Sequence, residues 1–174
     1  RRQDRSAYFE ETATSCSNYY LPYIEQHTSL KFGRKCRVME VGCGIGGILS
    51  IFAAMGATVT GIDIHKPSIE TAKTLFAERG LKGTFICSDI FDYSDTQPYD
   101  LIILHDALEH IPEKERLMLH LKSFLKADGL LYLGFPAWQM PFGGHQQMAK
   151  NRIIANCPYI HLLPRPLFRF VFRA

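Results

Sequence analysis

Short apolar segments separated by helical patterns dominate the middle of the chain. Five segments rich in Val, Ile and Leu recur between residues 37 and 136. The stretches between them carry apolar residues at helical spacing, as in Leu117, Leu121 and Leu125. Apolar strands that alternate with helices are typical of a parallel sheet covered on both faces. The pattern therefore predicts an α/β fold with a doubly wound, mostly parallel sheet.

Glycine, proline and charged residues mark where these elements begin and end. Gly56 and Gly80 follow the first two helical patterns of this region, and Pro67 stands in the first turn of the second. Asp128-Gly129 predicts a turn into the last strand. We expect strands at 38–41, 58–63, 84–88, 100–104 and 130–135, and helices at 19–27, 47–55, 67–79 and 113–126.

A glycine-rich turn follows the first strand, in the segment Val38-Met-Glu-Val-Gly-Cys-Gly-Ile-Gly-Gly47. Glycine accepts positive φ and lets the backbone approach a ligand, because no Cβ stands in the way. A helix that starts near Gly46 would aim its unpaired N–H groups at that ligand. Gly42, Gly44 and Gly47 also match the dinucleotide spacing G-x-G-x-x-G. The turn predicts a cofactor site at the end of the first strand, but this spacing alone does not identify the cofactor.

Acidic residues at the ends of later strands narrow the choice of cofactor. Asp63 ends the second strand about twenty residues past the glycine turn, where a carboxylate can accept both hydroxyls of a ribose. Asp89 ends the third strand and is placed to accept a hydrogen bond from an adenine amine. The fourth strand opens into His105-Asp-Ala-Leu-Glu-His-Ile-Pro112. These positions predict a nucleoside site along the carboxyl edge of the sheet.

The order of these motifs resembles that of the class I S-adenosylmethionine-dependent methyltransferases, in the small-molecule branch that includes quinone-biosynthesis O-methyltransferases. The resemblance covers residues 37 to 136 and rests on Glu40-x-Gly-x-Gly-x-Gly, Asp63, Ser88-Asp89 and His105 to Pro112. It implies a Rossmann-like methyltransferase fold, S-adenosylmethionine as cofactor and a small, hydroxyl-bearing methyl acceptor. The cofactor-binding residues that it implies are Glu40, Gly42, Cys43, Gly44, Gly46, Asp63, Ile64, Ser88, Asp89, Ile90 and His105.

Other interpretations of these motifs stay open. A nicotinamide-dependent oxidoreductase shares the glycine spacing, but it needs neither an acid at Glu40 nor a Glu-His pair after the fourth strand. A methyltransferase-like domain could also bind the cofactor, or only a partner, without catalysing transfer. We expect Glu40 to accept hydrogen bonds from the glycine turn or from the cofactor's amino group. The alternative is a buried acid satisfied only by backbone N–H groups.

The catalytic candidates are histidines and acids after the fourth strand and near the C-terminus. A sulfonium-bound methyl group is already activated, so the protein mainly has to align the acceptor, and a base near its hydroxyl helps. In the first hypothesis, His145 or His110 is the general base and Asp106 orients the substrate. Asp106, Glu109 and His110 stand at i, i+3 and i+4, which would place them on one face of a helical turn.

Two further hypotheses concern the same residues. Asp106, Glu109, His110 and His145 could gather a divalent metal ion that polarises the acceptor hydroxyl. The resemblance allows this, although the relatives that use a metal have Glu where this chain has Asp106, and Asp has a shorter reach. In the structural alternative, Glu109 and His110 only cap the following segment and pair with backbone near the cofactor.

The chain divides by pattern into three segments. Residues 1–36 form an N-terminal helical segment over the cofactor site, 37–136 the cofactor-binding core, and 137–174 a lid on the substrate side. The family usually adds two strands after the fifth, and the last 39 residues do not have that pattern. Because the chain also starts with Arg1, we expect a truncated piece that lacks the C-terminal strands. The rival interpretation of its aromatic, basic end is a membrane-facing or dimerising tail.

Several aromatic residues are candidates for covering the ligands. Tyr8, Tyr19 and Tyr20 could close over the methionine part of the cofactor, or simply pack as core and surface aromatics. Trp138 and Phe142 could line an apolar acceptor pocket, or only pack within the lid.

Composition excludes some classes of function. The chain has 174 residues, 47% hydrophobic and 21% charged, as in an ordinary globular domain. A net charge of +3 gives no case for nucleic acid as a partner, and no apolar run reaches the length of a membrane span. The five cysteines are odd in number and lack metal-type spacing, which favours reduced thiols in the cytoplasm. The sequence leaves open the acceptor, the atom that is methylated and the oligomeric state.

Overall fold

The structure is a computed structural model that describes residues 4–137, 139–142, 151–164 and 166–167. The chain forms two compact units, Arg1–Gly134 and Phe135–Ala174. The first unit holds the sheet and all the helices that cover it. In the second unit the described elements are α6 (Arg152–Ala155) and the 3₁₀ helix η5 (Ile160–Leu162).

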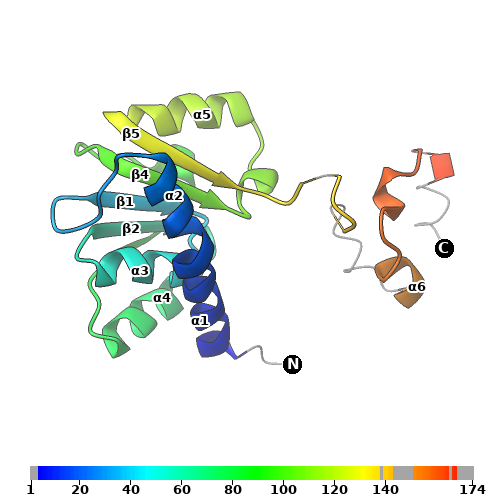
Figure 1. The fold of residues 1–174 in the computed structure, drawn as a ribbon, viewed down its shortest axis with the longest axis horizontal. Coiled ribbons are helices and arrows are strands. Elements are labelled where there is room, and N and C mark those ends of the chain that lie inside the picture. The colour runs from blue at the N-terminus through cyan, green and yellow to red at the C-terminus, as the bar shows by residue number, and fades with distance from the viewer. Residues whose placement is uncertain (1–3, 138, 143–150, 165, 168–174) are drawn as a thin grey trace. The chain divides into compact units, whose positions relative to one another are not determined.

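Five parallel strands form one sheet in the order β3-β2-β1-β4-β5 (Figure 1). The order reverses beside β1, so that the carboxyl ends of β1 and β4 lie next to each other. Such a reversal opens a crevice for ligands in doubly wound sheets. The predicted fold class is thereby confirmed. The strands are β1 (Arg37–Val41), β2 (Thr58–Asp63), β3 (Thr84–Cys87), β4 (Tyr99–His105) and β5 (Leu125–Gly134).

Each face of the sheet carries its own apolar core, because alternate side chains of a strand point to opposite faces. Val38 of β1 packs with residues of α3 (Gly47–Ala54), α4 (Lys66–Glu78) and the N-terminal helices. The next residue, Met39, packs on the other face with α5 (Lys114–Ser123). Figure 1 shows α5 on one side of the sheet and α3 and α4 on the other. This two-sided cover explains why the strands are continuously apolar.

The fifth strand begins earlier than the sequence predicts. Leu125 already pairs with Tyr99 of β4, and the register then shifts before Leu130 pairs with Leu101. The predicted turn at Asp128-Gly129 is therefore wrong, because these residues lie in an irregularity inside β5. A Cβ on Gly129 would stand 2.8 Å from the Tyr99 carbonyl oxygen, so the glycine allows the two backbones to approach.

Within the N-terminal segment predicted to be helical, the structure forms one α-helix more than the sequence placed. It consists of α1 (Arg5–Ser15), a π-helical turn η1 (Cys16–Tyr20) and α2 (Leu21–His27), where only a helix over 19–27 was expected. Asp4 caps α1 by accepting hydrogen bonds from the backbone N–H groups of Ser6 and Ala7. Only Phe9 and Ala13 of α1 are buried. So few apolar positions give a weak periodic signal, which is why the helix was missed.

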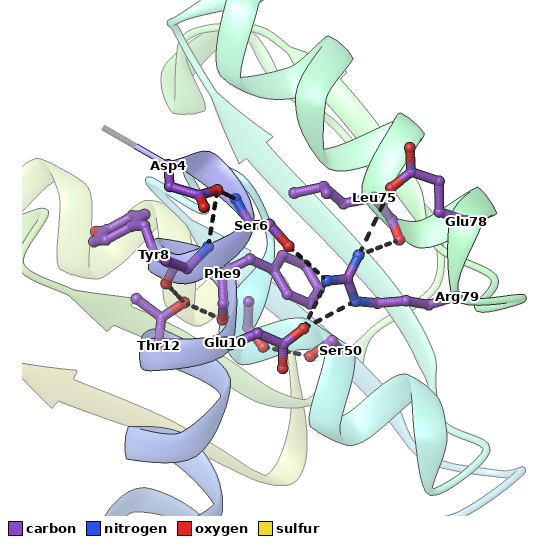
Figure 2. A network of polar contacts seen from close by, with 12 residues as sticks. Asp4, Ser6, Tyr8, Phe9, Glu10, Thr12, Ser50, Leu75, Glu78 and Arg79 are labelled. Carbon is purple, nitrogen blue, oxygen red and sulfur yellow. Dashed lines mark hydrogen bonds and ion pairs between the residues drawn. The ribbon is translucent and has the colours of Figure 1, made fainter. Parts of the chain in front are cut away.

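Contacts with α4 hold α1 against the sheet unit (Figure 2). The Arg79 guanidinium just after α4 donates to Glu10 Oε1 at 2.6 Å and to the carbonyl oxygen of Leu75 at 3.2 Å. The same guanidinium lies 4.4 Å from the centre of the Phe9 ring. A Cβ on Gly47 would stand 2.6 Å from the Phe9 carbonyl oxygen. Helix α1 therefore sits directly over the first residue of α3.

No helix in the described ranges is long and apolar enough to span a membrane. Of the predicted aromatic cover, Trp138 lies outside the described residues. Phe142 belongs to the second unit. The division into three segments and the role of 137–174 as a lid stay predictions.

Candidate cofactor and catalytic site

Three glycines shape the turn between β1 and α3. Gly42, Gly44 and Gly46 have φ values of 74°, 52° and 83°, in the left-handed region that other residues adopt at a cost. Gly46 is also the N-cap of α3. A Cβ on Gly42 would stand 2.6 Å from the Cβ of Ala107, in the segment after β4. The turn therefore needs glycine both for its backbone and for its contact with the neighbouring loop.

Asp63, at the end of β2, already binds two backbone donors. Its Oδ2 accepts a hydrogen bond from Gly44 N and its Oδ1 from His65 N, both at 2.8 Å. These bonds tie the glycine turn to the start of α4. Each carboxylate oxygen can accept further hydrogen bonds, so this role is compatible with the predicted contact to a ribose.

Glu40 is a buried acid in the strand that leads to the turn. It is 3% exposed, and no residue within the described part of the chain donates a hydrogen bond to its Oε2. Burial, together with the nearby Asp63 carboxylate, raises the pKa of Glu40 well above its usual range. Gly44 N donates to Asp63 instead. The turn does not satisfy this oxygen, which leaves an acceptor available for a ligand's ammonium group.

Two cavities open along the carboxyl edge of the sheet. The first measures about 290 Å³ and is lined by the glycine turn, Glu40, His105 and residues of α1 and η1. The second measures about 700 Å³ and is lined by the ends of β2 and β3 and the segment after β4. Gly42 and Asp106 line both cavities, so the cavities adjoin there. Together they form an elongated site.

The predicted cofactor-binding residues all line one cavity or the other. Glu40, Gly42, Cys43, Gly44, Gly46 and His105 line the first, and Gly42, Asp63, Ile64, Ser88, Asp89 and Ile90 line the second. Asp89 also caps the short 3₁₀ helix η2 (Ile90–Asp92), since its Oδ1 accepts from Phe91 N at 2.9 Å. The structure thus brings the predicted set together, while its binding role stays a prediction.

His105 and Asp106 lie where the two cavities adjoin. His105 Nε2 is 2.7 Å from the Tyr20 hydroxyl, and its Nδ1 is 3.6 Å from Asp106 Oδ2. Asp106 has a φ of 50°, and its N–H donates to the Gly134 carbonyl oxygen at 2.9 Å. Sequence reasoning missed the Tyr20–His105 pair. The two residues are 85 positions apart, and no local motif links them.

The segment that holds the other catalytic candidates does not form the expected helical turn. The left-handed backbone at Asp106 and the 3₁₀ helix η3 (Leu108–His110) replace the expected helical turn, which corrects that prediction. The side chain of His110 is 71% exposed and lines the second cavity. Both carboxylate oxygens of Glu109 are buried and have no hydrogen-bond partner within the described ranges, and Oε1 lies 3.9 Å from His110 Nε2.

The metal hypothesis receives no support from these residues. Among the described residues, no three His, Cys, Asp or Glu side chains group closely enough to hold a metal ion. His145 lies outside the described residues, so its predicted role as base or ligand stays untested. The capping alternative stays a prediction; in the same segment Lys114 donates to the carbonyl oxygens of Leu108 and Ile111 at 2.5 and 2.7 Å.

A parallel sheet with this strand order, a glycine turn after β1 and acids after β2 and β3 is the arrangement of the class I S-adenosylmethionine-dependent methyltransferases, although dinucleotide-binding folds share its strand order. The profile of the methyltransferase domain family matches residues 33–166. The chain therefore belongs to that family, as the sequence motifs predicted.

Known proteins of this family share the fold and part of the sequence. The chain is 39% identical over 119 residues to the ubiquinone biosynthesis O-methyltransferase of Actinobacillus pleuropneumoniae serotype 5b (strain L20). The matched region covers 64% of this chain and 50% of that relative. The chain spans about half the length of the curated relatives it matches.

Two solved structures bound to S-adenosylhomocysteine (SAH) are also similar. The plantazolicin methyltransferase BpumL is 26% identical, with a TM-score of 0.54 over 72% of this chain and 45% of its own. Coclaurine N-methyltransferase shares the fold, with a TM-score of 0.58 and 23% identity. The match covers 66% of this chain and 34% of that protein.

Proposed function

We propose that this chain binds S-adenosylmethionine across the two cavities and transfers its methyl group to a hydroxyl oxygen of a small acceptor. The observation that carries the proposal is a buried Glu40 oxygen, without a donor in the part of the chain that the structure describes, beside a left-handed glycine turn. It lies at one end of an elongated site whose other end is lined by Asp63 and Asp89.

The first cavity fits the amino-acid end of the cofactor. Glu40 would accept a hydrogen bond from its ammonium group, and a charge-assisted bond offsets the cost of burying the carboxylate. The glycine turn leaves room for the cofactor to approach the backbone closely. The N-terminus of α3, which has Gly46 as its N-cap, would face the carboxylate of the cofactor. Tyr8, Thr12 and Tyr20 of the N-terminal helices line the same cavity. We propose that these helices cover this end of the site.

The second cavity fits the nucleoside end. Asp63 would accept from the ribose hydroxyls with the oxygen lone pairs that Gly44 and His65 leave available. Asp89, which lines the cavity beside the apolar side chains of Ile64 and Ile90, would accept from the adenine amine. The apolar side chains suit the faces of a planar base.

The cofactor supplies a methyl group that is already activated on a sulfonium. The residues of the chain then have to align the acceptor and take up its proton. Asp106, which lines both cavities, is placed to orient the acceptor. His110 and His145 are the bases that the sequence predicts. The curated relatives are named O-methyltransferases, which supports an acceptor with a hydroxyl group.

Calorimetric titration with SAH tests the cofactor part of the proposal. NAD serves as the control, and magnesium is present in one series and absent in the other. We expect SAH to bind without magnesium and NAD not to bind. Binding of NAD alone would contradict S-adenosylmethionine as the cofactor of this site. No binding of either would contradict the proposed site, and titration of a longer chain would then show whether further residues are needed.

We also propose a cytoplasmic location. Cys16, Cys36 and Cys43 are buried thiols that pack in the core. Thiols of this kind are typical of proteins from reducing compartments.

A further inference from the structure

Two departures from regular structure and one close backbone contact meet around His105. Tyr20 ends the π-helical turn η1, and such turns inserted between α-helices are frequent at functional sites. Asp106, the next residue after His105, has a left-handed backbone. A Cβ on Gly134 would stand 2.6 Å from His105 Cδ2, so the ring lies directly against a glycine of β5. Costly local conformations that converge on one side chain favour a functional role for it.

His105 lies between the Tyr20 hydroxyl on one side and the Asp106 carboxylate on the other. The Tyr20 hydroxyl is 2.7 Å from Nε2, and the two ring centres are 4.7 Å apart. On the other side of the imidazole, the Asp106 carboxylate is 3.6 Å from Nδ1. A carboxylate on this side favours a proton on Nδ1, which leaves Nε2 as an acceptor. The geometry therefore favours a chain in which Tyr20 donates to His105 Nε2 while the Asp106 carboxylate lies 3.6 Å from Nδ1.

The surroundings keep the proton on Tyr20 in the resting state. Burial raises the pKa of the Tyr20 hydroxyl, and the neighbouring Tyr132 and Asp106 raise it further. A protonated hydroxyl is the donor that Nε2 requires. Tyr20 also packs against Tyr132 of β5, with ring centres 5.7 Å apart, so its ring is held from two sides.

All three groups line the first cavity, and Asp106 reaches the second as well. If the cofactor spans the two cavities, its sulfonium lies near the place where they adjoin, beside these groups. We propose that Tyr20, His105 and Asp106 form a proton relay for the methyl acceptor, with Tyr20 as the group that contacts the acceptor hydroxyl. This inference rests on the proposed function and assigns its base to residues other than His110 and His145.

The relay step balances without a further reactant. The acceptor hydroxyl gives its proton to Tyr20 Oη while Tyr20 gives its own to His105 Nε2. The acceptor oxygen forms the bond to the methyl carbon, and the pair of electrons from the broken carbon–sulfur bond stays on sulfur. Asp106 stabilises the resulting imidazolium, which afterwards loses its proton to water. His105 and Asp106 act through Tyr20 and are positioning residues in this scheme.

The test uses Tyr20→Phe, which removes the hydroxyl and keeps the ring. Tyr23→Phe is the matched control, because Tyr23 lies on the adjoining helix and also contacts Tyr132, 6.4 Å between ring centres. The probes are S-adenosylmethionine and a series of substituted phenols whose hydroxyls range from weakly to strongly acidic. We measure kcat/KM for each phenol, SAH affinity by calorimetry and the melting temperature.

The relay predicts a loss that depends on the acceptor. For weakly acidic phenols Tyr20→Phe should lose about 100-fold in kcat/KM, as expected for a lost acid–base group. For nitrophenols that are already ionised, the loss should nearly vanish because no proton has to be removed. SAH affinity should stay within about twofold, and Tyr23→Phe should resemble the parent on every phenol. On the phenol series, His105→Gln should show the same acidity-dependent loss in kcat/KM as Tyr20→Phe, and the double variant should be no worse than either in kcat/KM, since the groups act as a unit.

Other outcomes would overturn the relay. An equal loss in kcat/KM on all phenols would show that Tyr20 only lines the cavity and moves no proton. A loss in kcat/KM that depends on phenol acidity in His110→Gln alone would show that His110 is the base. If the parent binds SAH but methylates no phenol, the hydroxyl acceptor and the relay are both wrong while the cofactor site stands. If the parent does not bind SAH, the proposed function itself fails.

Discussion

The two cavities of the site are built in different ways. In the second cavity, Asp63 and Asp89 accept hydrogen bonds from backbone N–H groups two residues further on, so each acid is fixed by its own turn. In the first cavity, Glu40 Oε2 has no donor among the described residues, and His105 is held by Tyr20 from a helical turn far away in sequence. The two acids of the second cavity are therefore held by backbone N–H groups, Asp63 also by that of Gly44, whereas the first cavity depends on how the N-terminal helices dock.

This difference concerns function as well as assembly. A locally fixed acid is in place before any ligand arrives, which lowers the entropy cost of binding. A buried acid without a donor is unfavourable until a ligand supplies one. We infer that the nucleoside end is preorganised for binding, whereas the amino-acid end gains most from the bound ligand.

The largest expected effect comes from breaking the junction of the cavities with Gly42→Val. A valine would have to adopt a φ of 74° and would overlap the side chain of Ala107. Left-handed strain costs about 1–2 kcal/mol and overpacking about 1–3 kcal/mol. We expect SAH affinity, measured by calorimetry, to fall at least about 100-fold. Gly80→Ala is the control, because Gly80 is also left-handed at 63° but has open space around it and lines neither cavity. Comparable losses of affinity in both variants would contradict a specific role of the turn.

Asp63→Ala removes the acid that supports the second cavity. The loss of two hydrogen bonds from the ribose should cost on the order of 2–4 kcal/mol of cofactor affinity. Gly44 N also loses its acceptor, which should add to the effect. SAH is titrated into Asp63→Ala and into Asp63→Asn. The comparison separates the effect of losing the negative charge from the effect of losing the side chain. An unchanged affinity in Asp63→Ala would show that the ribose binds elsewhere.

Glu40→Gln tests the first cavity, because the substitution should change both the free energy of unfolding and the affinity for SAH. The folded-state pKa of Glu40 is raised, so folding favours its protonated form. In the ligand-free parent, the stability that comes with a protonated Glu40 is fully present below pH about 4. It is lost as pH rises towards the folded-state pKa of Glu40. The variant lacks this loss, and the parent's free energy of unfolding should therefore decline relative to the variant's as pH rises.

Binding should change in the opposite direction to stability. Glutamine cannot form a charge-assisted bond with an ammonium group, so Glu40→Gln should weaken SAH about tenfold at neutral pH. Denaturant unfolding at several pH values and calorimetry check the two effects. Parallel pH dependences of parent and variant would show that Glu40 does not titrate differently in the folded state.

The smallest expected effect comes from loosening α1 with Arg79→Met. The variant loses the partly buried ion pair with Glu10 and the cation–π contact with Phe9 that Figure 2 shows around α1. We expect about 1 kcal/mol of lost stability and a loss of SAH affinity of a few fold, because α1 lines the first cavity. Lys73→Met is the control, since it removes an exposed pair with Glu70 on the same helix. Similar effects of both substitutions on SAH affinity would mean that the docking of α1 does not matter for binding.

The sequence predicted the sheet and most of its helices because their signals are local. Continuous apolar strands, amphipathic helices and glycine or proline at the ends identify α3, α4 and α5 to within a few residues. Helix α1 escaped because it buries only Phe9 and Ala13. The start of β5 escaped because a glycine inside a strand irregularity resembles a turn.

For the site, the sequence by itself determined which acids and glycines stand at the carboxyl edge of the sheet. Parallel strands end at one edge, so the residues that follow them must gather there, and all the predicted cofactor residues line the two cavities. Only the tertiary structure decided that Tyr20 meets His105, and that a left-handed residue and a 3₁₀ helix replace the helical turn expected from Asp106 to His110. Contacts between distant residues depend on how helices pack, and a left-handed residue redirects the chain after it. Neither has a periodic signature that the sequence alone reveals.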